Sequence, residues 1–320
     1  MSDHFLGEAI MTYFISFASL TAYVLLFCPT LLLSQGKLGV DFTPKLIQIT
    51  EDIYAYEGPL ELPGEEEIVR TNSLIIITDA GVVVVDGQDT PEEGRRLVEA
   101  IREITDQPIR YLINASPHGD HVNSNEVFEN AMIIAQENAR EAIGAMRETA
   151  TDNEINLILP HITYDKQMVL HIGTKTIELH HFGFGHTRGD TVVYLPEEGV
   201  AFLTELYFNG IAASVGEGYA EQHLETLRRA LNLDAEWFIP GHGYIDGYSA
   251  AELREGANRY HQNVQAIHDA VLKHVKQGHS LDQTLASIDE ELGEFAELPF
   301  YQFLKTGCIG GTYRALSKNR

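Results

Sequence analysis

Asn114–His121 read NASPHGDH, and this stretch decides the fold. It ends an apolar run that predicts a buried strand. His118, Asp120 and His121 lie within four positions, so their side chains converge only if the backbone turns sharply, which Gly119 permits. Imidazole and carboxylate are the donors that zinc takes when no thiolate is available. The stretch therefore predicts a metal-binding loop, although a polar loop that caps the following helix would look similar.

Two later histidines are displayed in a similar way, each in a loop that follows an apolar strand. His186 lies in FGFGHTRGD, and His242 lies in FIPGHGYID between Gly241 and Gly243. Loops at strand ends carry the sites of α/β folds, because they converge there while the scaffold stays rigid. Three such loops in one chain predict imidazoles gathered around an ion rather than the satisfied histidines of a core.

The order of these motifs resembles the metallo-β-lactamase superfamily, whose signature is HxHxDH, then GHTxGD, then an acidic residue after a strand, then PGHG. The resemblance runs from about Leu46 to Tyr244. It implies an α/β fold, a four-layer αββα sandwich with the metals at one edge of its two sheets. It also implies that Asp86, in VVVVDGQD, supports the metal loop without binding metal.

The chain departs from the family pattern at two positions. Ser116 stands where the family has its first histidine, and Glu205 stands where the family has a bridging aspartate. A serine hydroxyl is a poorer zinc ligand than imidazole. The longer side chain of Glu205 could reach either of the two metal sites of the family.

The resemblance implies six metal ligands, which are His118, Asp120, His121, His186, Glu205 and His242. The first site keeps two imidazoles, and the second keeps two imidazoles and an aspartate, with Glu205 available to both. Three protein ligands and a water suffice for a catalytic zinc site. We therefore expect Zn²⁺ as the cofactor, at one or two ions per chain with one favoured, and we expect the second site to fill first.

Zinc with an open coordination position lowers the pKa of water to about 7, which supplies a nucleophile for a carbonyl carbon. The expected activity is hydrolysis of a β-lactam, lactone, ester or thioester, with Asp120 as the catalytic residue that orients the water and moves its proton. Asp190 either orients a ligand imidazole or caps a turn, and His180 and His181 are expected to be structural. The alternatives are a catalytically silent ligand-binding protein and an iron-dependent redox enzyme of the same fold.

Composition restricts the partners of the chain. The 320 residues carry a formal net charge of -25, and a surface this acidic repels phosphate backbones, so nucleic acid is excluded and a small-molecule substrate is expected. The two cysteines, Cys28 and Cys308, are too few for a cysteine-rich zinc module.

The predicted organisation has three parts. Residues 1–37 form a hydrophobic leader or membrane anchor, because 10–33 are almost continuously apolar and long enough to cross a bilayer. Residues 38–250 form the catalytic domain, and 251–320 form a helical extension that covers the cleft or supports a homodimer. The leader favours a membrane-anchored or exported protein over a cytoplasmic one, although no Lys or Arg precedes it.

Patterns along the catalytic domain predict alternating strands and helices. Residues 82–85 are apolar on both faces and predict a fully buried strand, and 200–206 predict another strand. Helices are expected over 91–104, 123–130, 138–149 and 221–231. Four histidines of the extension are expected on solvated helix surfaces rather than at a metal, namely His261, His268, His274 and His279.

Overall fold

The computed structural model of the chain describes residues 43–61, 68–149, 156–215 and 217–318. The predicted leader and Cys28 lie outside these residues, so the anchor stays a prediction. Within the described ranges, none of the helices combines the length and the apolar character that a membrane span requires.

Two sheets carry the fold. The first has nine strands in the order β1-β2-β3-β4-β5-β6-β7, antiparallel as far as β4 and parallel beyond it, with β14 added to β3 and β12 to β14. These strands are β1 (Lys45–Gln48), β2 (Ile53–Glu61), β3 (Ile68–Thr78), β4 (Gly81–Val85), β5 (Ile109–Asn114), β6 (Met132–Gln136), β7 (Ile162–Tyr164), β12 (Phe208–Asn209) and β14 (His242–Gly243).

The second sheet has five strands in the order β13-β11-β10-β9-β8. They are β8 (Gln167–Ile172), β9 (Lys175–His180), β10 (Val192–Leu195), β11 (Val200–Phe202) and β13 (Trp237–Ile239). All neighbours are antiparallel except β11 and β13, which are parallel. The chain therefore leaves β11 and β13 at the same edge of this sheet.

Strand β4 shows how the layers are built. Its side chains alternate between two faces, with Val83 and Val85 in the core between the sheets and Val82 and Val84 against Leu97 of helix α1 (Pro91–Ile104). The prediction that this strand is buried on both faces is confirmed.

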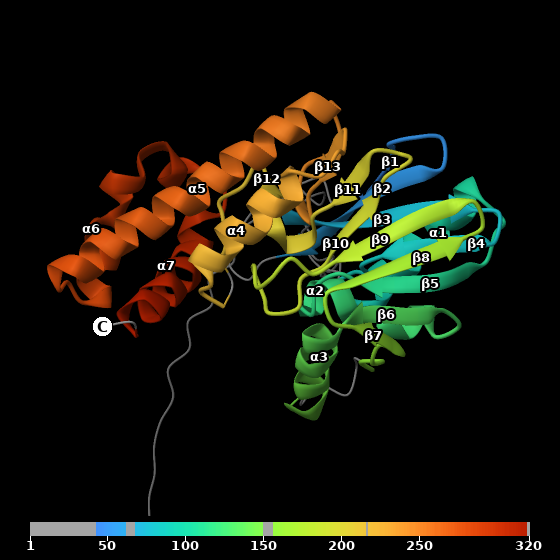
Figure 1. Cartoon of the computed structure of the whole chain (residues 1–320), viewed down its shortest axis with the longest axis horizontal. Coiled ribbons are helices and arrows are strands. Elements are labelled where there is room, and N and C mark those ends of the chain that lie inside the picture. The colour runs from blue at the N-terminus through green and yellow to red at the C-terminus, as the bar shows by residue number, and fades with distance from the viewer. Residues whose placement is uncertain (1–42, 62–67, 150–155, 216, 319–320) are drawn as a thin grey trace, which may run out of the picture. The chain divides into compact units, whose positions relative to one another are not determined.

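Helices cover the outer faces of both sheets. Helices α4 (Ala220–Leu231) and α5 (Ala250–Gln277) pack against the outer face of the second sheet. Helix α1 packs against the outer face of the first sheet, and α3 (Glu137–Thr149) follows β6. The four layers confirm the predicted αββα sandwich (Figure 1).

Two sequence predictions about helices are wrong. In place of a helix over 123–130 there are two short turns, α2 (Gly119–Val122) and the 3₁₀ helix η1 (Asn125–Phe128). The side chain of Ser124 accepts a hydrogen bond from the backbone N–H of Gln88, and the side chain of Asn125 exchanges hydrogen bonds with that of Asn114. Such side-chain hydrogen bonds compete with a regular helix.

The second correction concerns His274, which is 2% exposed rather than solvated. Its Nε2 lies 3.2 Å from a carboxylate oxygen of Glu291, and its Nδ1 lies 2.8 Å from Nδ1 of His279. The ring is buried because α6 packs on α5, and the other three histidines of the extension are half-buried.

The predicted helical extension is present. After α5 come α6 (Leu281–Leu292), the 3₁₀ helix η3 (Gly293–Glu297) and α7 (Tyr301–Ser317), which lie side by side in orange to red in Figure 1. Ser249 and Ser280 cap α5 and α6 through reciprocal bonds with Glu252 and Gln283. These caps explain why the helices begin where they do.

Candidate metal centre

The six candidate ligands converge at the edge where several strands end. His118, Asp120 and His121 follow β5 at the start of α2, and His186 lies in the loop after β9. Glu205 is in the 3₁₀ helix η2 (Thr204–Leu206) after β11, and His242 opens β14. The loops that carry these residues follow strand ends at the same edge of the sandwich, so they bring together residues that are far apart in the sequence.

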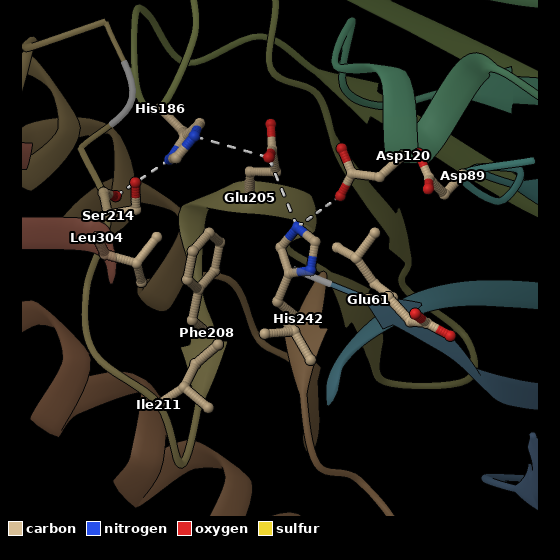
Figure 2. A pocket seen from close by; sticks show the side chains of 12 residues that line it. Glu61, Asp89, Asp120, His186, Glu205, Phe208, Ile211, Ser214, His242 and Leu304 are labelled. Atoms are coloured by element: carbon tan, nitrogen blue, oxygen red, sulfur yellow. Dashed lines mark hydrogen bonds and ion pairs between the residues drawn. The ribbon is translucent and has the colours of Figure 1, made fainter. Parts of the chain in front are cut away.

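Glu205 occupies the centre of the cluster and is 3% exposed. Its Oε2 accepts a hydrogen bond from the hydroxyl of Ser116 at 2.5 Å, and Nδ1 of His118 lies 2.9 Å from its Oε1. Three further ring nitrogens lie 3.6–3.7 Å from Oε1, namely Nε2 of His121, His186 and His242. Figure 2 shows the carboxylate between His186 and His242, with Asp120 beside it.

The donor atoms form two groups that share this carboxylate. The first group is His118, His186 and Glu205, and the second is Asp120, His121, Glu205 and His242. Within each group the donor atoms lie within 4.8 Å of one another. Zinc–ligand bonds are about 2.0–2.3 Å long, so donors at such separations can share one ion. The residues present therefore fit a metal, and Glu205 gives the first group a third donor where Ser116 supplies none.

Three of the imidazoles are already oriented by hydrogen bonds on their outer side. Each ring places Nδ1 against an acceptor outside the cluster, which leaves Nε2 directed inwards as a donor for a metal. The three pairs are His121 with Oδ2 of Asp86, His186 with the carbonyl of Ser214, and His242 with the carbonyl of Arg70, each at 3.0 Å.

Strained backbone surrounds the ligands. Asp86 and Thr204 adopt positive φ angles of 58° and 43°. The angle at Thr204 is a genuine outlier, because Thr204 is β-branched. The Thr204 hydroxyl donates to Oδ2 of Asp86 at 3.0 Å, and the backbone N–H of Ala115 donates to Oδ1. The left-handed turn at Thr204 also ends the strand predicted over 200–206, because β11 stops at Phe202 and the chain then turns Glu205 into the cluster.

Replacing Asp86 by alanine is expected to reduce the free energy of unfolding by ~3 kcal/mol, since three buried donors would lose their acceptor. It is also expected to weaken metal binding by about 10–100-fold, because the imidazole of His121 loses its orienting partner. Urea unfolding and a competitive zinc titration measure the two effects. Asp106→Ala, at an exposed position, is the matched control. A change below about 1 kcal/mol in the Asp86 variant would contradict the assigned supporting role.

Glycines allow the last ligand loop to pack closely. A Cβ at Gly241 would overlap the carbonyl of Thr204, and one at Gly243, where φ is +86°, would overlap the carbonyl of Asn209. The two glycines beside His242 are therefore required by the contact between this loop and the Glu205 loop.

Without a metal, the pKa values of the buried histidines and of Glu205 are set by burial and by the charges of one another. Burial alone would lower the pKa of His118, but the charge and hydrogen bond of Glu205 outweigh it and raise the pKa to about 9. Burial lowers the pKa of His186 to about 4. Burial would raise the pKa of Glu205, but the positive charge of His118 holds it well below its ordinary range. His118 and Glu205 thus form an ion pair in the metal-free protein.

Filling the first donor group with excess zinc at pH 7.5 is accordingly expected to release at least one proton, because His118, a member of that group, must lose its proton to bind metal. The raised pKa also stabilises the metal-free fold fully below pH 6.5, and this contribution is lost as the pH rises through about 9. An indicator dye in weakly buffered solution measures the release, and unfolding at several pH values measures the stability. The variant His118→Asn should release fewer protons, and equal release from both proteins would refute the assignment.

Three residues considered from the sequence lie outside the donor groups. The carboxylate of Asp190 accepts hydrogen bonds from the backbone N–H and the hydroxyl of Thr187, so it caps the turn after His186 rather than orienting a ligand imidazole. His180 lies 2.8 Å from a carboxylate oxygen of Glu178, and His181 donates to the carbonyl of Asp190 at 2.9 Å.

The cluster opens into a pocket of about 420 Å³ whose other walls the sequence analysis missed. Its lining residues are Leu60, Glu61, Val69, Asp89, Asp120, His186, Glu205, Phe208, Ile211, Ser214, His242 and Leu304. Several come from segments with no ligand motif, and Leu304 belongs to α7. No local signal could have found these residues, since Glu61 ends β2 and Val69 lies near the start of β3, in stretches without a ligand motif.

Comparison with known proteins agrees with this geometry. A family model described as the metallo-beta-lactamase superfamily matches residues 68–242, more than half of the chain. The alpha subunit of a 2,4-dinitroanisole O-demethylase from a Nocardioides species is 25% identical over 224 residues, which are 65% of this chain and 66% of that subunit. A type 2 metallo-beta-lactamase from Bacteroides fragilis is 19% identical over 239 residues, 72% of this chain and 92% of that one.

A solved structure has the same fold. The metallo-beta-lactamase from Pontibacter korlensis superposes with a TM-score of 0.58 at 20% identity and covers 69% of this chain and all of its own. Similarity at this level of identity concerns the fold and leaves the substrate open.

Proposed function

This chain belongs to the metallo-β-lactamase superfamily, and on that premise we propose that it is a zinc-dependent hydrolase that attacks a carbonyl carbon. The candidate substrate classes are esters, lactones, thioesters and β-lactams. The observation that carries the proposal is the pair of donor groups that share Glu205 and open into a pocket of small-molecule size.

We assign metal binding and proton transfer to different side chains of the site. Asp120, His121, Glu205 and His242 would hold the favoured zinc, and His118 and His186 would complete a second site with Glu205. The metal would supply Lewis acidity that makes water a nucleophile near neutral pH. Oδ2 of Asp120 accepts a hydrogen bond from the hydroxyl of Thr71 at 3.4 Å, and the same carboxylate lines the pocket. This position supports the proposal that Asp120 orients a water and takes its proton at a carboxylate oxygen.

The metal content distinguishes the two donor groups. We propose one zinc per chain, in the second group, because it offers four donors against three in the first. Ser116→His should raise the content towards two, since an imidazole would replace a hydroxyl that now donates to Glu205 and accepts from the backbone N–H of His118. Metal analysis after dialysis measures this. Ser116→Ala is the matched control, because it removes the hydroxyl without adding a donor, and two tightly bound zincs in the unaltered chain would refute the proposal.

Turnover of a substrate panel tests the function itself. Zinc-loaded protein would be assayed with a neutral p-nitrophenyl ester, a lactone, a thioester, a β-lactam and 2,4-dinitroanisole, the compound named for the Nocardioides relative. Hydrolysis that a chelator abolishes and zinc restores is the expected result. Absence of chelator-sensitive turnover across the panel would favour the silent binding protein, and turnover that needs iron would favour a redox member of the fold.

A further inference from the structure

The pocket beside the metal centre carries negative charge without a matching cation. Four carboxylates line it, those of Glu61, Asp89, Asp120 and Glu205, while none of its lining residues in the described ranges is a lysine or an arginine. Figure 2 shows Glu61 and Asp89 on the side of Asp120, away from Phe208, Ile211 and Leu304. One divalent ion would leave the carboxylate charge in excess, and two would only balance it.

Two basic residues that neighbour pocket-lining residues in the sequence have partners outside the pocket. Arg70 follows Val69 on β3, so strand alternation points it to the other face, where its guanidinium donates to the carbonyl of Thr43. Lys305 follows Leu304 on α7, and its ammonium forms an ion pair of 2.6 Å with Asp289. Neither can neutralise a substrate anion in the pocket without giving up these partners.

The opposite wall of the pocket is apolar. Phe208, Ile211 and Leu304 lie together there in Figure 2, and the ring of Phe208 contacts that of His242 edge to face at 4.6 Å between centroids. Such a wall favours an uncharged hydrocarbon group near the reacting carbonyl. The extension thus contributes Leu304 to the wall of the pocket.

We propose that this pocket selects uncharged or cationic substrates with an apolar acyl group and rejects those that carry a carboxylate. A substrate carboxylate would lose its hydration and meet no cationic side chain while lying among Glu61 and Asp89. Neutral esters and lactones are then preferred over anionic β-lactams. This inference rests on the proposed hydrolase function and adds the charge class of the substrate.

Three p-nitrophenyl esters with acyl chains of similar length test the inference. They are the valerate, the mono-glutarate and the γ-(trimethylammonio)butyrate, which end in a methyl group, a carboxylate and a cation. At low salt, kcat/KM for the glutarate should be about tenfold or more below that for the valerate, and the cationic ester should equal or exceed the valerate. The difference should shrink at high salt.

A charge reversal sharpens the test. Glu61→Lys places a cation at an exposed position of the rim and should raise the glutarate-to-valerate ratio of kcat/KM by about tenfold. Glu99→Lys makes the same change in net charge on the exposed side of α1, outside the pocket, and should leave the ratio unaltered.

The outcomes separate this inference from the proposed function. If glutarate is hydrolysed as well as valerate and a chelator stops both reactions, charge selection is wrong while the hydrolase stands. If no ester is turned over, the ketone analogues, in which a methylene replaces the ester oxygen, still report the order by calorimetric binding. Binding of the anionic ketone at least as tight as that of the neutral one would then overturn the inference.

Discussion

Replacing Glu205 by glutamine is expected to weaken zinc binding in both donor groups and to lower kcat/KM by at least about 100-fold. Glu205 is the one residue that belongs to both donor groups found among the described residues, so its loss weakens both at once. A neutral amide is a weaker ligand than a carboxylate, and His118 would also lose the anion that pairs with it. Metal analysis after dialysis and steady-state kinetics measure the two effects.

Two further variants make this result interpretable. Glu236→Gln, at an exposed position, controls for the change in net charge. Glu205→Asp restores the charge with one methylene less and should recover metal in at least one group, because a carboxylate at this position can still reach it. Full metal content in Glu205→Gln would show that the shared carboxylate is not a ligand.

Replacing Asp120 by asparagine is expected to separate catalysis from metal binding. Turnover should fall by about 10²–10⁴-fold, since the amide cannot accept a proton from water. Zinc affinity should fall much less, because three other donors remain in the second group and asparagine keeps an oxygen in the same place. kcat for the neutral ester and a competitive zinc titration measure the two quantities.

The comparison with an exposed aspartate completes the experiment. Asp106→Asn should match the unaltered protein in both measurements. If Asp120→Asn loses affinity and turnover by the same factor, Asp120 acts only as a ligand and the proton acceptor lies elsewhere.

The sequence predicted the fold and the convergence of the site because both follow from local patterns. The apolar run at 82–85, the helix that Pro91 begins and the Gly-flanked histidines are each recognisable within a few residues. Strand ends in an α/β sandwich share an edge, so ligand loops that follow strands must meet. Family resemblance then supplied the roles of Asp86 and Glu205.

The features that the sequence did not predict depend on contacts between segments that pack together in the fold. Asp190 proved to cap a turn, and the burial of His274 came from α6, a helix that packs on its own α5. The helix expected over 123–130 gave way to short turns because side chains found partners in other loops.

Motifs in the sequence were enough to identify the side chains that could bind a metal and the order in which they follow the strands. The packing of the loops was needed to show that Glu205, 89 positions beyond Ser116, accepts a hydrogen bond from it and joins both donor groups, and that Leu304 lines the pocket. The physical reason is that periodicity and turn chemistry act over a few residues, whereas distances between loops are set by the packing of two sheets and the helices that cover them.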